Sequence, residues 1–85
     1  MSFALQAWTD EYCQTFDRLP HHIQEAIQKK VDAMGRRLAE FPHQKLQGRP
    51  GFRLRVGDYR VIYRFDLNKG RIFLLYVGNR REVYR

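Results

Sequence analysis

The sequence predicts an α+β fold that begins with an N-terminal strand, continues with a hairpin of two helices, and ends with a mainly antiparallel sheet of three further strands. Apolar residues recur every three or four positions between Ile23 and Leu38, which is the period of an amphipathic helix. After Pro42 apolar and polar residues alternate, which is the period of a strand. This change of period separates a helical part from a sheet part, and we expect the helices to pack on one face of the sheet.

One strand and one short helix are expected first. Residues 3–8 have moderate strand character and end at Thr9. Thr9 suits the start of a helix because its hydroxyl can accept a hydrogen bond from a free backbone N–H of the first turn. The two acids that follow it favour the positive end of a helix. The short helix should run to about Arg18.

A longer helix should follow. Pro20 suits its first helical position, where the N–H that proline lacks would have no partner anyway. The helix should run to about Glu40 and stop before Pro42. Gly35 should weaken it modestly, because glycine loses more backbone freedom on folding than other residues.

The sheet part begins with residues 45–51, which we interpret as a loop because they contain two glycines and a proline. Near the end of the chain, a turn at residues 66–70 should lead into a strand at residues 72–77. That strand is apolar on both faces, as expected of a central one. Gly78 and Asn79 should end it, and a short extended tail should follow.

Two strands joined by a tight hairpin are predicted at residues 52–56 and 59–65, where apolar residues alternate with arginines. Only Gly57 and Asp58 separate them, and a two-residue loop with glycine first suits a hairpin. The loop length sets the register of the two strands.

This register places Arg55 opposite Arg60, with Arg53 and Arg64 on the same face of the sheet. Like charges directly opposite each other destabilise a sheet by up to ~1 kcal/mol. We therefore expect an anion to lie between the two arginines. The alternative is that both side chains extend into water.

The charge of the chain supports an anionic partner. Residues 1–44 carry five Lys/Arg against six Asp/Glu, whereas residues 45–85 carry eleven against three, and the whole chain has a net charge of +7. Nine of those eleven are arginine, whose planar set of donors matches phosphate oxygens. A polyanion is the expected class of partner. The alternative is a solvated face that serves solubility.

Several classes of protein are excluded or disfavoured. The length fits a single domain, residues 1–85. No apolar run approaches the ~18 residues of a membrane span, and the N-terminus lacks a basic segment followed by an apolar one, so we expect a cytoplasmic protein. Cys13 alone cannot form a disulfide within the chain, and the histidines are not spaced as zinc ligands. We expect neither a metal ion nor another cofactor.

Cleavage of RNA through its own 2′-hydroxyl needs charge stabilisation at phosphorus and a group that moves a proton. Arginine supplies the first and cannot readily supply the second. Tyr84, close to Arg80 and Arg81, is a candidate because neighbouring cations favour a phenolate, although it could equally be an ordinary aromatic contact of a chain end. The three histidines are interpreted as surface residues: His21, His22 and His43.

Three segments carry a family resemblance: residues 45–48 (KLQG), residues 52–63 (FRLRVGDYRVIY) and residues 76–84 (YVGNRREVY). They closely resemble the RelE/ParE superfamily of toxins from bacterial type II toxin-antitoxin modules, on the RelE branch. The resemblance covers almost the whole chain. It implies a RelE-like fold and an endoribonuclease that cuts mRNA in the ribosomal A site. It also implies a co-expressed protein antitoxin, for which charge complementarity suggests an acidic, partly disordered segment.

The resemblance implies roles for individual residues. The family's basic pair before the hairpin falls on Arg53 and Arg55, and its arginine after the hairpin falls on Arg60. The arginine that follows Val-Gly falls on Arg80, and the tyrosine of the tail on Tyr84. The best-known members have lysines where this chain has its first arginine pair. Because an arginine essentially cannot exchange protons, the identity of the general base stays open.

We therefore predict a metal-independent endoribonuclease that inhibits translation, with ribosome, mRNA and an antitoxin as partners and no membrane. The predicted catalytic residues are Arg55, Arg60, Arg80 and Tyr84. The predicted RNA-binding residues are Lys45, Arg49, Arg53, Arg64 and Arg81. Two alternatives have no need for catalytic residues to converge on one phosphate: a ParE-like toxin that binds DNA gyrase, and a basic RNA-binding module.

Overall fold

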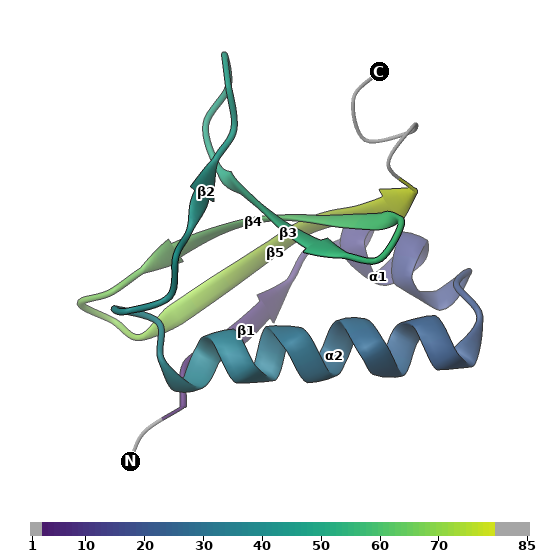
Figure 1. Ribbon diagram of the computed structural model, residues 1–85, viewed down its shortest axis with the longest axis horizontal. Coiled ribbons are helices and arrows are strands. Elements are labelled where there is room, and N and C mark those ends of the chain that lie inside the picture. The colour runs from purple at the N-terminus through teal and green to yellow at the C-terminus, as the bar shows by residue number, and fades with distance from the viewer. Residues whose placement is uncertain (1–2, 80–85) are drawn as a thin grey trace.

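The computed structural model describes residues 3–79, which form two helices and one five-stranded sheet (Figure 1). The elements in chain order are β1 (Leu5–Trp8), α1 (Asp10–Asp17), α2 (His21–Arg36), β2 (Gln44–Lys45), β3 (Phe52–Val56), β4 (Tyr59–Asp66) and β5 (Arg71–Asn79). The strand order in the sheet is β1-β5-β4-β3-β2. Only β1 and β5 run parallel among these neighbours. The predicted α+β class is confirmed.

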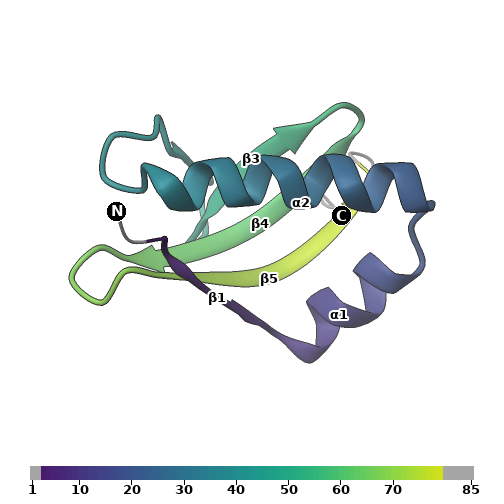
Figure 2. The ribbon, with the colours of Figure 1, turned by 90° about the horizontal axis from the view of Figure 1, so that it is seen from below.

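Both helices cover the same face of the sheet, and the core lies between them and the strands (Figure 2). Apolar side chains of α1 and α2 pack against the side chains of β3, β4 and β5 that point toward the helices. The buried cluster consists of Tyr12, Phe16, Ile27, Val31, Met34, Leu38, Leu54, Val61, Tyr63, Ile72, Leu74 and Val77. Within residues 3–79, no helix covers the opposite face of the sheet, which we call the open face (Figure 2). Among the described residues, no helix is long and apolar enough to cross a membrane.

The helices begin close to where they were predicted. Thr9 caps α1, because its Oγ1 accepts a hydrogen bond from the N–H of Tyr12 at 3.1 Å. Pro20 is the residue before α2 rather than its first helical residue, a correction that follows from its extended ψ of 148°. The helix starts at His21.

The second helix is shorter than predicted, since α2 ends at Arg36 and not near Glu40. The carbonyl oxygen of Gly35 accepts a hydrogen bond from the N–H of Ala4, at 3.1 Å, instead of one from the next helical turn. The following residue, Arg37, leaves the helical region, with φ −139° and ψ 46°. A contact with the N-terminal segment therefore stops the helix early.

The sheet contains one strand more than predicted. Lys45, the first residue of the segment interpreted as a loop, pairs with β3 together with Gln44 as the short strand β2. The chain can reverse between these strands because Gly48 and Gly51 adopt positive φ values of 73° and 110°. The prediction that β5 ends before Gly78 was also wrong, since its pairing with β4 continues to Asn79.

The hairpin register predicted from the loop length is confirmed. Arg55 pairs with Arg60 and Val56 with Tyr59. Gly57 has φ +59°, which a side chain would disfavour and which the first position of such a loop requires. The two arginines are therefore direct neighbours across β3 and β4.

His43 is not a surface residue, which corrects the interpretation made from the sequence. Its Nε2 lies 2.7 Å from the carbonyl oxygen of Leu38, and its Nδ1 lies 2.6 Å from the hydroxyl of Tyr63. Because a carbonyl only accepts, Nε2 donates to Leu38, and Nδ1 shares a second hydrogen bond with the Tyr63 hydroxyl. The ring also stacks on Phe65, at 4.0 Å between centroids. The other two histidines are exposed, as predicted.

Replacing a buried tyrosine by phenylalanine should affect stability in opposite directions at two positions. The hydroxyl of Tyr12 is buried without a hydrogen-bond partner among the described residues, whereas that of Tyr63 is bonded to His43. Tyr12→Phe should raise the free energy of unfolding by about 1 kcal/mol, and Tyr63→Phe should lower it by a similar amount because His43 loses a hydrogen-bond partner. Urea unfolding at pH 7 measures both. Equal effects of the two substitutions would contradict the hydrogen bonding described.

Candidate functional site

The open face of the sheet carries a row of four arginines. Paired residues of neighbouring strands share a face, and successive residues alternate between faces. Because Leu54, Val61 and Tyr63 point into the core, the residues on either side of them point to the open face. We call this row the arginine face: Arg53, Arg55, Arg60 and Arg64. The four side chains were predicted to share one face, and the register places them there.

Arg60 is the buried member of the row, with only 7% of its surface exposed. Its Nη1 donates a long hydrogen bond of 3.4 Å to the carbonyl oxygen of Tyr59. No carboxylate among residues 3–79 forms an ion pair with it. A buried charge is costly unless it is paired, so the site of Arg60 is prepared for an anion.

The strands that carry the arginines are held by polar contacts to neighbouring elements. Lys30 of α2 donates a hydrogen bond of 2.8 Å from Nζ to the carbonyl oxygen of Arg55. Arg53 donates one of 3.3 Å from Nε to Oε1 of Gln44 in β2. The backbone at Arg55 and the side chain at Arg53 are thus tied to elements on either side of the hairpin.

A bulge in β5 brings a further side chain to the open face. Tyr63 pairs with Leu74 and Ile62 pairs with Tyr76, so Leu75 has no partner in β4. Tyr76 therefore shares the face of Ile62, which lies between arginines on β4. Sequence reasoning missed Tyr76, because a strand that is apolar on both faces gives no alternation from which a bulge could be read.

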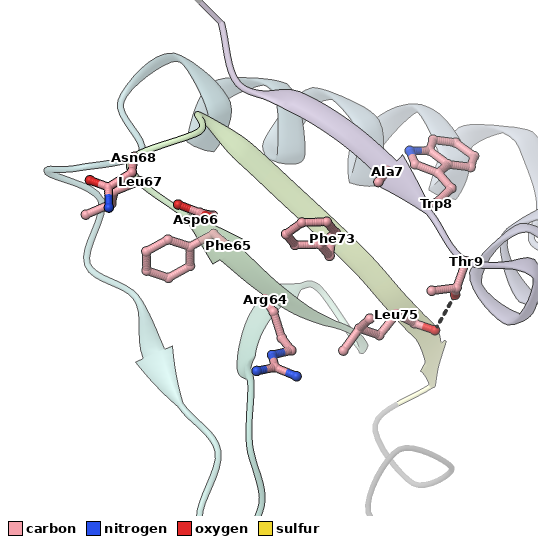
Figure 3. Close-up of a pocket in the computed structure, with 10 residues that line it drawn as sticks. All are labelled: Ala7, Trp8, Thr9, Arg64, Phe65, Asp66, Leu67, Asn68, Phe73 and Leu75. Carbon is pink, nitrogen blue, oxygen red and sulfur yellow. Dashed lines mark hydrogen bonds between the residues drawn. The ribbon is translucent and has the colours of Figure 1, made fainter.

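An open pocket of about 840 Å³ adjoins the arginine face at β1, β4 and β5 (Figure 3). Arg64 and Phe73, which pair across the strands, contribute to its wall together with Leu75. Thr9 closes one end, where its Oγ1 donates a hydrogen bond of 2.9 Å to the carbonyl oxygen of Leu75. Among the described residues, the lining combines apolar side chains with the exposed Arg64 and the carboxylate of Asp66.

The other predicted site residues lie outside the row. Lys45 belongs to β2 and pairs with Phe52, and it lines a small depression that Arg53 also lines. Arg49 is exposed in the loop between β2 and β3. Three further predicted residues lie outside the described part of the chain: Arg80, Arg81 and Tyr84. Of the predicted catalytic residues, the structure brings together Arg55 and Arg60.

The positive charge of the site comes from guanidinium groups, whose planar set of donors matches the oxygens of an anion. Between residues 3 and 79, no cluster of His, Cys, Asp and Glu could hold a metal ion. The geometry offers charge-assisted hydrogen bonds to an anion and apolar surface beside them.

Comparisons with known proteins agree with this fold. The family model described as ParE toxin of type II toxin-antitoxin system, parDE, matches residues 7–84. A search of curated proteins finds no match.

Solved structures of RelE toxins share the fold. The RelBE2 toxin-antitoxin complex from Mycobacterium tuberculosis has a TM-score of 0.78 at 23% identity, over 93% of this chain and 93% of that one. The isolated E. coli RelE toxin has a TM-score of 0.76 at 22% identity, over 95% and 90%. The archaeal RelE–RelB complex from Pyrococcus horikoshii OT3 has a TM-score of 0.75 at 22% identity, over 93% and 97%. The predicted RelE-like arrangement is thereby confirmed.

Proposed function

The chain belongs to the ParE toxin family of type II toxin-antitoxin systems, and from this premise we propose that it is an endoribonuclease that cleaves mRNA in the ribosomal A site and thereby inhibits translation. It is a toxin with a RelE-like fold. The observation that carries the proposal is the buried Arg60, which has no described carboxylate partner and lies directly opposite Arg55.

The arginines suit a reaction in which negative charge increases at phosphorus. The 2′-hydroxyl of the RNA attacks the adjacent phosphorus, its proton passes to a base, and the 5′-oxygen of the next nucleotide leaves with a proton. The products are a 2′,3′-cyclic phosphate and a 5′-hydroxyl. Arg55 and Arg60 stabilise the charge of the transition state, and the buried Arg60 holds its donors in place before the substrate arrives.

Roles for the end of the chain follow from the family resemblance alone. Arg80 would add a third cation at the same phosphate, and Tyr84 would move a proton, a task that arginine performs poorly.

Binding of RNA and ribosome is proposed to use the more distributed cations. These are Lys45, Arg49, Arg53, Arg64 and Arg81. They neutralise phosphates and so position the substrate without taking part in the bond rearrangement.

A protein antitoxin is the second proposed partner. Several of the RelE-like structures are complexes with a RelB antitoxin. A chain with a net charge of +7 fits an acidic partner. Such a partner would silence the toxin within the cell that makes it.

The proposal is tested by expressing the chain in bacteria and following the incorporation of labelled methionine and labelled thymidine. Protein synthesis should stop first. Purified toxin added to programmed ribosomes should leave mRNA fragments with a 5′-hydroxyl and a 2′,3′-cyclic phosphate. Prior arrest of DNA synthesis would favour the gyrase alternative, and fragments with a 5′-phosphate would contradict the mechanism.

A further inference from the structure

We propose that Tyr76 is a further substrate-contacting residue, whose hydroxyl donates a hydrogen bond to the phosphate that Arg55 and Arg60 hold. The inference rests on the proposed function, which it deepens by adding a neutral donor to the site.

The bulge at Leu75 is the first observation. Leu74 is a core residue, so without the bulge strict alternation would place Leu75 on the open face and Tyr76 in the core. With the bulge, Tyr76 pairs with Ile62 on the open face, and Val77 returns to the core opposite Val61. Bulges beside active sites often direct a side chain to a particular place. The bulge here secures a phenol on the face that carries the arginines.

Gly78 is the second observation, because its missing side chain leaves the space that the phenol ring uses. A Cβ on Gly78 would lie 2.9 Å from Cε2 and 3.0 Å from the hydroxyl oxygen of Tyr76. The ring therefore extends along β5 and lies against the backbone of this glycine. Only glycine allows that position.

The partner of Gly78 in β4 is the third observation. Gly78 pairs with Arg60, and Arg60 pairs in turn with Arg55 on β3. The Tyr76 hydroxyl therefore lies in the same row across the sheet as the two arginines. Between residues 3 and 79 it has no hydrogen-bond partner, so its donor is available to a ligand.

A phenol hydroxyl at this place complements the arginines. A phosphate in the transition state carries several oxygens that accept hydrogen bonds, and a donor that is already positioned strengthens binding there. A hydrogen bond to a charged group is stronger than one between neutral groups. The substrate class that this donor recognises is the phosphodiester of RNA.

The test is single-turnover cleavage of mRNA in the A site of programmed ribosomes. Tyr76→Phe keeps the ring and removes only the hydroxyl, so cleavage should slow by about tenfold or more while ribosome affinity is unchanged. Tyr59→Phe is the matched control, because Tyr59 lies on the helix side of the same end of the sheet. Its cleavage rate should stay within about twofold of wild type.

Gly78→Ala supplies a second, independent variant, since its methyl group would displace the ring. It should slow cleavage in the wild-type background and add little in the Tyr76→Phe background, where the hydroxyl is already absent. Thermal unfolding of each variant identifies any that fails to fold.

Equal cleavage rates for wild type and Tyr76→Phe would overturn the inference alone. Equal effects of Gly78→Ala in both backgrounds would contradict the placement of the hydroxyl. A wild-type toxin that leaves A-site mRNA intact would overturn the proposed function and this inference with it.

Discussion

Arg60→Ala is expected to slow single-turnover cleavage of A-site mRNA by about 10²- to 10³-fold, which is the range seen when one preorganised donor to a developing negative charge is removed. Arg60 is buried and lacks a described carboxylate partner, so its charge is directed to a ligand. Arg60→Lys should recover only part of the rate, because lysine keeps the charge but loses the planar pair of donors.

The stability of the variant separates this effect from unfolding. Removing a buried charge that has no described ion-pair partner should leave the free energy of unfolding unchanged or raise it. Urea unfolding of Arg60→Ala tests this. A large loss of stability would indicate that the charge has a structural role instead.

Lys29→Ala is the control for net charge, since Lys29 is exposed on α2 and lies on the helix side of the sheet. It removes the same charge and should leave cleavage unaffected.

Lys45→Ala and Arg49→Ala should behave differently from both Arg60→Ala and Lys29→Ala. They should weaken ribosome binding and reduce its dependence on salt, while the cleavage rate at saturation changes little. Cleavage by Arg60→Ala at the wild-type rate would remove Arg60 from the mechanism.

Naked mRNA is expected to be cleaved at least about 10³-fold more slowly than the same mRNA in the A site. Among the described residues, no helix covers the arginine face and no histidine lies on it to move a proton. Orientation of the 2′-hydroxyl in line with the leaving oxygen must then come from the ribosome, which can supply many kcal/mol of barrier reduction.

The measurement compares kcat/KM for a ribosome programmed with an empty A site and for the free RNA. A ribosome whose A site is occupied by tRNA is the control and should protect the mRNA. The slow cleavage of naked RNA should persist in EDTA, because the proposed mechanism uses arginine and not a metal ion for charge stabilisation. Equal rates on free and ribosome-bound mRNA would contradict the ribosome's role in orientation.

Local patterns in the sequence were enough to predict the fold class and the Arg55–Arg60 pair. The period of three or four residues in α2 and the alternation in β3 and β4 each report which face of an element is apolar. A two-residue loop at Gly57 and Asp58 allows only one register between β3 and β4. The pairing of Arg55 with Arg60 therefore follows from counting residues outward from the loop.

Contacts between distant residues decided the rest, because no local pattern reports them. His43 was interpreted as a surface residue from the sequence, but its ring is hydrogen-bonded to Tyr63, which lies twenty residues away in the chain. The helix ends at Arg36 because the N–H of Ala4 donates a hydrogen bond to the carbonyl oxygen of Gly35. Each partner comes from another element and is brought near only when the chain folds.

The site shows the same division. The sequence by itself determined that arginines line one face of the sheet, since alternation and a two-residue loop leave no other arrangement. Only the tertiary structure decided that Arg60 is buried among them and that Tyr76 joins them. The burial of Arg60 depends on what packs around its side chain, and the bulge at Leu75 depends on how β5 pairs with β4. Neither is a property of a single strand.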